Sequence, residues 1–439
     1  MKSLFKKLLP TSFLKILRPV YHGGLAWLAA MYYGQPSRRL TVIGVTGTAG
    51  KSTTVKMLAH ILNLFGKKCG YITTVSFYDG NTEYINKHGL SMPGGPLLQK
   101  QLKTMADNGC AYAIVECTSE GLAQNRHMGI GFSGAVFTNL SPAHLDTHGS
   151  FENYRAAKGK LFEGVKQFKK SFFVVNVDDP NSDYFLQFSA KEKIGVTGDE
   201  HKKQYYALNN VLWYHDVEAG EGVSFVVEQT SFSIPMAGEF NATNAALAVA
   251  TAHVLGVSLE HSSQALGNFS GAAGRMEEIP NVLGIKVFVD YAPEPAAMQA
   301  ALTAVNHMPH NRIIHMFGST GGHRDVAKRA EFGRISARLA DVIVITNDDV
   351  YETDPQVIAT NIQEGISEVL PEQRKVKNIQ TILDRKEAIA YALSIARPND
   401  IVLFTGKGSE QFLVLPDNQR IEWDEREEVK KILNKIEQN

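Results

Sequence analysis

The chain has 439 residues, more than one hydrophobic core usually organises, so two or three domains are expected. Its 45 Lys and Arg residues balance its 45 Asp and Glu residues, which argues against nucleic acid as a main partner. Three cysteines without paired metal-ligand spacing, Cys69, Cys110 and Cys117, exclude a disulfide framework and favour a reducing compartment, the cytoplasm, with the thiols as buried small side chains.

The first 34 residues mix basic and apolar side chains and finish with an apolar stretch, Leu25 to Tyr33. This stretch is shorter than the ~20 residues that a membrane-spanning helix needs. No cleavage site follows a long apolar core. We therefore expect one or two short amphipathic helices. Two roles stay open for residues 1–34: peripheral contact with the anionic inner face of a membrane, or docking on the body of the protein.

From Arg39 onward, short β-branched runs alternate with helical patterns, which predicts a parallel sheet covered by helices. The candidate strands are LTVIGVT (40–46), YAIVEC (112–117), SGAVFTN (133–139), SFFVVNV (171–177), IKVFVDY (285–291), RIIHMFG (312–318), DVIVITN (341–347) and DIVLFTG (400–406). Residues 191–235 are more polar and predict shorter strands that form an antiparallel edge.

A domain boundary is expected in GAAGRMEEIPNVLG, residues 271–284, where glycines and a proline separate a helical pattern from a new strand. The predicted fold class is α/β with three parts. These are a helical N-terminal segment (1–38), a central P-loop-type domain with a mostly parallel sheet (39–278) and a C-terminal Rossmann-like α/β domain (279–439).

The stretch VIGVTGTAGKSTTVKM predicts a phosphate-binding loop between a strand and a helix. Gly47 and Gly50 allow a tight turn that points backbone N–H groups inward, at the N-terminus of a helix that begins near Lys51. Lys51 would reach the outer phosphates of a nucleotide, and Ser52 would place its hydroxyl on Mg²⁺. Val45 departs from the strict spacing, but the strand, the helix and the GK-hydroxyl triplet all agree with an anion site.

Three more residues raise the question of catalysis. Glu116 ends an apolar run, and therefore lies at the carboxyl end of a strand, where α/β sheets place ligands. His144 follows the next strand in a loop, and Lys158 lies on the helix beyond it. Taken singly, Glu116 also fits a hydrogen-bonded strand-end acid, and the other two fit a solvated surface. A carboxylate beside a nucleotide could hold its metal.

These residues belong to a longer series of motifs. In order along the chain stand GVTGTAGKSTT, ECTSEGLAQNR, FTNLSPAHLDTHG, YRAAK, GEFNATNAALA, GRME, VDYAPEP, GGHRD and GKGSE. The series covers about residues 40–425 and resembles the Mur ligase family of ADP-forming amide synthetases, most closely the UDP-N-acetylmuramyl-tripeptide synthetase type. The resemblance implies an ATP-dependent ligase of peptidoglycan precursor synthesis.

The implied reaction has two steps. ATP would phosphorylate a carboxylate of a muramyl-dipeptide acceptor, and the amine of diaminopimelate, lysine or a similar amino acid would then attack this acyl phosphate. The products would be an amide, ADP and phosphate. Phosphoryl transfer of this kind depends on positioning and on the stabilisation of charge by metal ions and cations.

The resemblance also assigns the catalytic and nucleotide sites. Lys51, Glu116, His144 and Lys158 would be catalytic; two Mg²⁺ ions are implied, the first on Ser52 and the second on Glu116 and His144. Lys158 matches a lysine that the family carries in carbamylated form. ATP would be bound by Gly47, Thr48, Gly50, Lys51, Ser52, Thr53, Asn241, Asn244, Arg275 and Asp290. The two asparagines could equally be helix caps, and the last two residues lie near the expected hinge.

Substrate contacts are implied at both ends of the chain. Those of the muramyl-peptide acceptor are Thr118, Gln124 and Arg126. Arg324 of GGHRD would bind the carboxylate of the incoming amino acid, and Asp348 opens the amino-acid-selecting motif. Gly406 and Glu410 of GKGSE would read the far amino group of a diamino acid. The chain is expected to act as a monomer.

Two departures leave the substrate open. Asp348-Asp349-Val350-Tyr351 stands where D-N-P-R is expected, which weakens diaminopimelate and admits lysine. Only about 40 residues precede the phosphate loop, in place of a uridine-binding domain, so a lipid-linked acceptor or one held by its sugar and peptide is an alternative. Folate, poly-glutamate or glutamate-amidating ligases and a non-catalytic ATP and muropeptide binder are further alternatives. Glu116, His144 and Lys158 favour catalysis because a mere binder does not need them.

Overall fold

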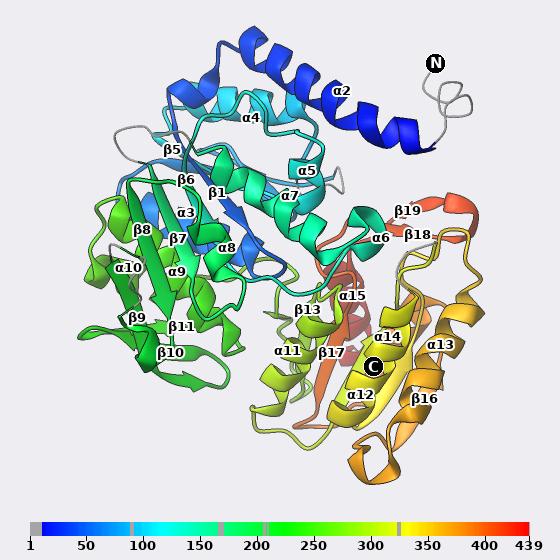
Figure 1. Cartoon of the computed structure of the whole chain (residues 1–439). Coiled ribbons are helices and arrows are strands. Elements are labelled where there is room, and N and C mark those ends of the chain that lie inside the picture. Colours follow the sequence, from blue (N-terminus) through cyan, green and yellow to red (C-terminus); the bar gives the residue numbers. More distant parts are fainter. Residues whose placement is uncertain are drawn as a thin grey trace. The chain divides into compact units, whose positions relative to one another are not determined.

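The computed structural model describes residues 11–87, 92–165, 171–204, 208, 210–322 and 326–438 (Figure 1). The backbone divides into two compact units. The first unit consists of Met1–Pro142, Thr147–His215 and Thr243–Ala265, and the second consists of Ala143–Asp146, Asp216–Ala242 and Leu266–Asn439.

The first unit is organised around a mostly parallel sheet. Its strands are β1 (Thr41–Thr46), β2 (Cys69–Ile72), β3 (Ser76–Tyr78), β4 (Glu83–Ile85), β5 (Tyr112–Glu116), β6 (Phe132–Phe137), β7 (Phe172–Asn176), β8 (Glu192–Thr197) and β9 (Asn210–Ala219). They follow the order β9-β8-β7-β6-β1-β5-β2-β3-β4, and β3 and β4 are the antiparallel members. The central strand β1 pairs parallel with both β5 and β6, so their carboxyl ends meet at one edge.

The antiparallel edge expected for residues 191–235 is only partly present. β8 pairs parallel with β7, and β9 pairs parallel with β8. The antiparallel pair is instead β10 (Val223–Val227) with β11 (Thr230–Ile234). The last four residues of β8 are buried despite its polar first half, and this tertiary burial could not be inferred from composition.

Helices follow most of these strands. They are α2 (Thr11–Tyr32), α3 (Lys51–Leu64), α4 (Gly95–Asp107), α5 (Ser119–Ala123), α6 (Leu145–His148), α7 (Phe151–Glu163), α8 (Ser182–Leu186), α9 (Phe240–Val254) and α10 (Leu259–Gly267). α3 packs on β1, β2 and β5, and α7 packs on β1 and β6.

Within the first 34 residues the structure describes one helix, α2, whose 22 residues make it longer than the one or two short helices that the sequence predicted, and a short 3₁₀ helix follows at Pro36–Arg38. Pro19 lies inside α2 without ending it. α2 lies along α4, and this packing compensates for a residue that weakens an isolated helix (Figure 1). Among the residues described, no helix is both long and apolar enough to cross a bilayer.

The second unit contains a Rossmann-like sheet, with strands β12 (Glu277–Glu278), β13 (Lys286–Asp290), β14 (Ile313–Phe317), β15 (Val342–Ile345), β16 (Asn378–Thr381) and β17 (Ile401–Thr405). Their order is β12-β13-β17-β14-β15-β16, with β12 antiparallel and the others parallel. β18 (Phe412–Val414) and β19 (Arg420–Glu422) form a separate hairpin. The helices are α11 (Pro295–Asn306), α12 (Ala327–Leu339), α13 (Pro355–Glu368), α14 (Arg385–Ser394) and α15 (Glu425–Glu437).

Both faces of this sheet are buried. In β15, Val342 and Val344 belong to one apolar cluster with α14 and α15, whereas Ile343 and Ile345 belong to another with α11, α12 and α13. Successive side chains of a strand point to opposite faces, so a continuous apolar run is what a two-sided core requires. The eight strands predicted from the sequence are all present, as β1, β5, β6, β7, β13, β14, β15 and β17, and the α/β fold class is confirmed.

Candidate functional site

The phosphate loop of the first unit joins β1 to α3 and needs its glycines. Gly50 has a φ of 79°, and a Cβ there would collide with Oδ1 of Asn244. A Cβ on Gly47 would collide with Oγ1 of Thr138. The loop N–H groups differ from the prediction, because those of Thr48 and Ala49 donate to Asn139 (2.8 and 2.9 Å) and not into the loop.

Ser52 and Glu116 lie together beside this loop. The Ser52 hydroxyl donates to Oε2 of Glu116 at 2.7 Å, and both side chains are buried. The same carboxylate accepts from the backbone N–H and the hydroxyl of Thr74, at 2.9 and 2.8 Å. Hydroxyl and carboxylate oxygens are ligands that suit Mg²⁺, so Ser52 fits the first metal site that the resemblance implies, and Glu116 fits the second, directly beside it. Glu116 ends β5, and Ser52 lies in the first turn of α3, which follows β1 and the phosphate loop. The parallel pairing of β1 with β5 therefore brings the two residues together.

Two lysines converge on the same loop. Nζ of Lys51 donates to the Thr48 carbonyl at 2.8 Å, and Nζ of Lys158, from α7, donates to the Gly47 carbonyl at 2.6 Å. Lys158 is only 2% exposed. Burial, together with the charge of Lys51, lowers the pKa of Lys158 well below its ordinary value, although Glu116 opposes this shift.

The remaining nucleotide residues of the first unit surround the loop. The Thr48 hydroxyl donates to the Ser141 carbonyl at 3.2 Å and lies 3.0 Å from the Tyr154 hydroxyl. Thr53 is buried in α3, and Asn244, from α9, lies against Gly50. The structure therefore gathers every predicted residue of this unit that concerns nucleotide or metal.

Two predicted residues belong by their backbone to the second unit. His144 precedes α6 with a φ of 54°, an unusual value for a residue with a side chain. Asn241, near the start of α9, donates from Nδ2 to the Ala237 carbonyl at 2.7 Å. That bond matches the alternative interpretation of Asn241 as a residue that caps local backbone. The ligand roles of both residues stay predictions.

The predicted acceptor residues flank α5: Thr118 directly precedes it, and Gln124 and Arg126 follow it. The Thr118 side chain caps α5 by accepting from the Gly121 N–H at 3.3 Å. Arg126 donates from Nε and Nη2 to Oε1 of Gln124, at 3.1 and 2.8 Å, and from Nη1 to the Met92 carbonyl at 2.7 Å. These bonds hold the guanidinium in place, and burial lowers the pKa of Arg126 from its ordinary value.

In the second unit, Arg275 and Asp290 are neighbours. The guanidinium of Arg275 lies over the ring of Tyr291, 4.5 Å from its centre, and its Nε is buried without a hydrogen-bond partner. Asp290 ends β13 and accepts from the Met276 N–H at 2.6 Å. Burial raises the pKa of Asp290 although Arg275 opposes that shift. An incompletely bonded guanidinium at a strand end suits an anion such as phosphate.

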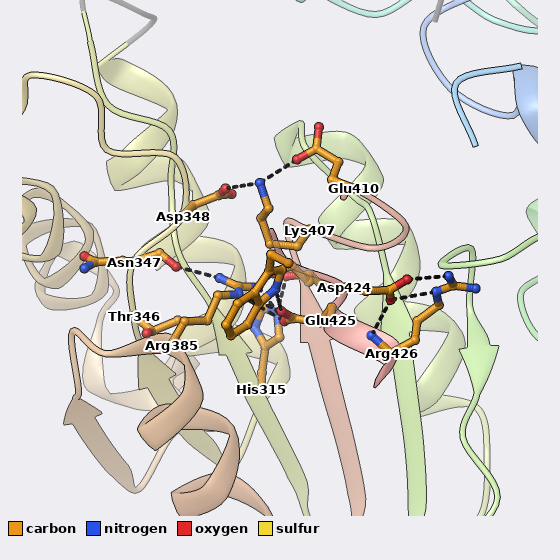
Figure 2. A network of polar contacts seen from close by, with 12 residues as sticks. His315, Thr346, Asn347, Asp348, Arg385, Lys407, Glu410, Asp424, Glu425 and Arg426 are labelled. Carbon is orange, nitrogen blue, oxygen red and sulfur yellow. Dashed lines mark hydrogen bonds and ion pairs between the residues drawn. The ribbon is translucent and has the colours of Figure 1, made fainter. Parts of the chain in front are cut away.

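Asp348, Asp349 and Glu410 form an acidic cluster where β15 and β17 end, and Lys407 lies in its middle. Nζ of Lys407 is 2.7 Å from Glu410, 2.8 Å from Asp349 and 3.6 Å from Asp348 (Figure 2). Burial alone would lower the pKa of Lys407, but the three carboxylates raise it above its ordinary value. Gly406 has a φ of 110°, and a Cβ there would approach Oδ2 of Asp348 to 2.8 Å. Three carboxylates and one ammonium leave this acidic cluster with an excess of negative charge.

A buried ion pair lies next to this acidic cluster. Arg385 and Glu425 are 0% and 1% exposed, with contacts of 2.6 to 3.1 Å between the guanidinium and the carboxylate (Figure 2). Arg385 also donates to the Asn347 carbonyl at 2.7 Å and to the Thr405 carbonyl at 3.0 Å. It therefore holds the backbone directly before Asp348 and Gly406.

Several of these residues were not predicted from the sequence. They are Thr74, Lys407, Arg385, Glu425, and Asp349 as a member of the acidic cluster. Lys407 had a usable signal, since it lies inside GKGSE. Arg324, predicted to bind the amino acid's carboxylate, lies outside the residues that the structure describes. The cysteines Cys69, Cys110 and Cys117 are free and buried, as expected.

Comparison with known proteins gives a consistent result. Residues 45–252 match the Mur ligase middle domain and residues 274–408 match the Mur ligase, glutamate ligase domain. A UDP-N-acetylmuramoyl-L-alanyl-D-glutamate–2,6-diaminopimelate ligase of Clostridioides difficile (strain 630) is 33% identical over 420 residues, which cover 94% of this chain and 82% of that protein. A UDP-N-acetylmuramyl-tripeptide synthetase of Roseiflexus sp. (strain RS-1) is 35% identical over 426 residues, with the same coverage.

The similarity extends to solved structures. One structure of a UDP-N-acetylmuramoyl-L-alanyl-D-glutamate–2,6-diaminopimelate ligase superposes with a TM-score of 0.58 and 26% identity. The match covers 91% of this chain and 79% of the other. The same architecture therefore underlies both chains.

Proposed function

This chain belongs to the Mur ligase family of ADP-forming amide ligases, which use ATP and Mg²⁺, and we propose that it joins a diamino acid to a muramyl-dipeptide acceptor. The observation that carries the proposal is the buried group of Ser52, Glu116 and Lys158 around the phosphate loop. A protein that only bound a nucleotide could use the carboxylate for Mg²⁺, but it would not need a second, buried lysine beside that carboxylate. The acceptor class follows from the named relatives.

The residues of the chain divide the chemistry between them. Lys51 would bind the outer phosphates of ATP and stabilise the charge on the phosphoryl group during its transfer to the acceptor carboxylate. Ser52 would hold a first Mg²⁺ and Glu116 a second, and Mg²⁺ neutralises phosphate charge when bound. Arg126, already fixed by Gln124, would orient an anionic group of the acceptor. We propose two Mg²⁺ ions, with His144 on the second.

The acidic cluster is the basis of our proposal that the added amino acid is a diamino acid. A second amino group, charged at neutral pH, would bind to the carboxylates of Glu410 and Asp348 beside the ammonium of Lys407. Diaminopimelate and lysine both carry such a group. Asp349 accepts from Lys407 and from the Val414 N–H, each at 2.8 Å, so its role is to hold the cluster in place. We further propose that the chain acts as a monomer in the cytoplasm. Its two main domains would span residues 39–278 and 279–439.

Phosphate release tests this function directly. The purified chain, with ATP and Mg²⁺, is offered UDP-MurNAc-L-Ala-D-Glu with lysine, diaminopimelate or other amino acids, and product masses are read by mass spectrometry. We expect release that depends on both acceptor and diamino acid, with one residue added. Release with monoamino acids alone would contradict the amino-acid proposal. Turnover only with a lipid-linked or nucleotide-free muramyl peptide would change the acceptor but keep the ligase.

Glu116→Gln is expected to raise the Mg²⁺ concentration needed for half-maximal phosphate release by at least about tenfold. Glutamine keeps the size of the side chain and can still accept from Thr74, but it removes the negative charge that attracts the metal. The measurement is a Mg²⁺ titration of phosphate release. Glu83→Gln is the matched control, because Glu83 also accepts from a serine, Ser76, but outside the phosphate loop. An unchanged Mg²⁺ dependence in the first variant would remove Glu116 from the metal site.

Glu410→Gln is expected to raise the KM for the diamino acid by roughly tenfold to a hundredfold while the KM for ATP stays unchanged. The reason is the loss of a charged hydrogen bond to the substrate's second amino group, about 1.5–3 kcal/mol. Steady-state kinetics with each substrate varied in turn give both constants. Glu422→Gln, an exposed acid on β19, is the control. An unchanged KM for the diamino acid would remove Glu410 from the amino-acid site, whereas a folding defect would lower the apparent kcat and leave both KM values unchanged.

A further inference from the structure

The helix α2 is apolar on two opposite faces, which is unusual for a helix on the surface of a protein. Its buried face carries only small residues: Gly23, Ala26, Ala29 and Ala30. Its outer face carries large ones, with exposed fractions of 70% for Val20, 60% for Tyr21, 37% for Leu25, 51% for Trp27, 60% for Leu28, 51% for Met31 and 84% for Tyr32. Exposed apolar patches of this kind mark interaction sites.

The small face is fitted closely to the body of the first unit, so α2 cannot simply rotate to hide the large residues. A Cβ on Gly95, at the start of α4, would overlap Ala26, and one on Gly129 would overlap Ala30. The Asn125 side chain donates to the Pro19 carbonyl at 3.5 Å. α2 lies along α4 in Figure 1. Docking on the protein therefore fixes which face of the helix points outward.

The charge of this region is strongly one-sided. The chain as a whole has no net charge, but its first acidic residue is Asp79. Before it, the sequence around α2 contains Lys2, Lys6, Lys7, Lys15, Arg18, Arg38 and Arg39. Arg18 and Arg38 are exposed, whereas Arg39 is paired with Asp107 at 2.9 Å. The exposed apolar face is thus accompanied by basic side chains, with no acid on the helix itself.

We propose that the outer face of α2 binds the surface of a membrane that contains anionic phospholipids. Trp27, Leu28 and Met31 would enter the boundary between headgroups and acyl chains, and the exposed Arg18 and Arg38 would bind the headgroups. Trp27 and the tyrosines at positions 21 and 32 belong to the residue types that prefer this boundary. A second copy of the chain fits the face less well, because two α2 helices in contact would bring basic residues together. This proposal is independent of the ligase reaction.

Vesicle co-sedimentation of the full chain tests the proposal. We expect binding to vesicles that contain phosphatidylglycerol to be at least about tenfold stronger than to pure phosphatidylcholine, since one basic side chain near an anionic surface contributes about fivefold. Raised salt should weaken this binding. The emission of Trp27 should shift to shorter wavelength on the anionic vesicles, and Trp27→Phe should abolish that shift.

Leu28→Glu separates the face from the rest of the protein. Because Leu28 is exposed, the variant should fold and keep its ligase activity on a soluble acceptor, but bind anionic vesicles at least about tenfold more weakly. Val282→Glu, at an 81% exposed apolar residue of the second unit, should bind as the unaltered chain does. Equal binding of both lipid compositions, or unchanged binding by Leu28→Glu, would overturn the proposal. The proposal would also be overturned if the chain formed a dimer that did not bind vesicles and that Leu28→Glu dissociated.

Discussion

Replacing Lys158 with alanine is expected to lower ATP-dependent phosphate release by a factor of about 10–100, the cost of removing a group that supports a metal site. Lys158 is almost completely buried, with Nζ 2.6 Å from the Gly47 carbonyl at the phosphate loop. Burial lowers its pKa, and Lys51 lowers it further, so the neutral amine forms more readily than that of an exposed lysine. A neutral amine can add CO₂: an N–C bond forms, a proton leaves, and the product is a carbamate with carboxylate-like oxygens.

The expected role of Lys158 can be separated from a loss of folding. Lys160→Ala changes a lysine two positions along the same helix, whose Nζ lies 3.1 Å from Oδ1 of Asn125, and should leave phosphate release nearly intact. Acetate or formate should restore part of the activity of Lys158→Ala by supplying a carboxylate. With ¹³C-bicarbonate, a carbamate signal should appear in the NMR spectrum of the unaltered chain and not in that of the variant. Full activity in Lys158→Ala would refute the assignment.

Glu425→Gln is expected to destabilise the second unit by about 3–5 kcal/mol, because it leaves the buried guanidinium of Arg385 without its counter-charge. Both side chains are excluded from water, and Nη2 of Arg385 lies 2.6 Å from Glu425. Urea unfolding followed by tryptophan fluorescence measures the loss. Trp423 is a local probe, since its Nε1 donates to Glu425 at 2.8 Å.

A surface pair supplies the comparison for Glu425. Glu427→Gln removes the partner of Lys430 at a distance of 3.1 Å, with both side chains well exposed, and should cost less than about 1 kcal/mol. Equal losses in the two variants would contradict the importance of burial. Because Arg385 also binds the Asn347 and Thr405 carbonyls, Glu425→Gln should raise the KM for the amino acid even where the chain remains folded. An unchanged KM would mean that this pair supports stability alone.

The sequence by itself determined the parts of the molecule that are local. The strand, the turn at Gly47 and Gly50, and the helix from Lys51 lie within about 25 residues, and their patterns predicted them. Glu116 was predicted at a strand end for the same reason. Parallel pairing of β1 and β5 then brings Glu116 beside Ser52, and the alternation of strands and helices was enough to predict such pairing.

Only the tertiary structure decided how distant side chains meet. Lys407 and Asp349 are 58 positions apart, and Arg385 and Glu425 are 40 apart, so no periodicity of the sequence joins them. The parallel pairing of β8 and β9 and the outward face of α2 also depend on packing partners elsewhere in the chain. Local patterns report propensity and amphipathicity, whereas burial and the partner of each charge arise when separate elements pack together.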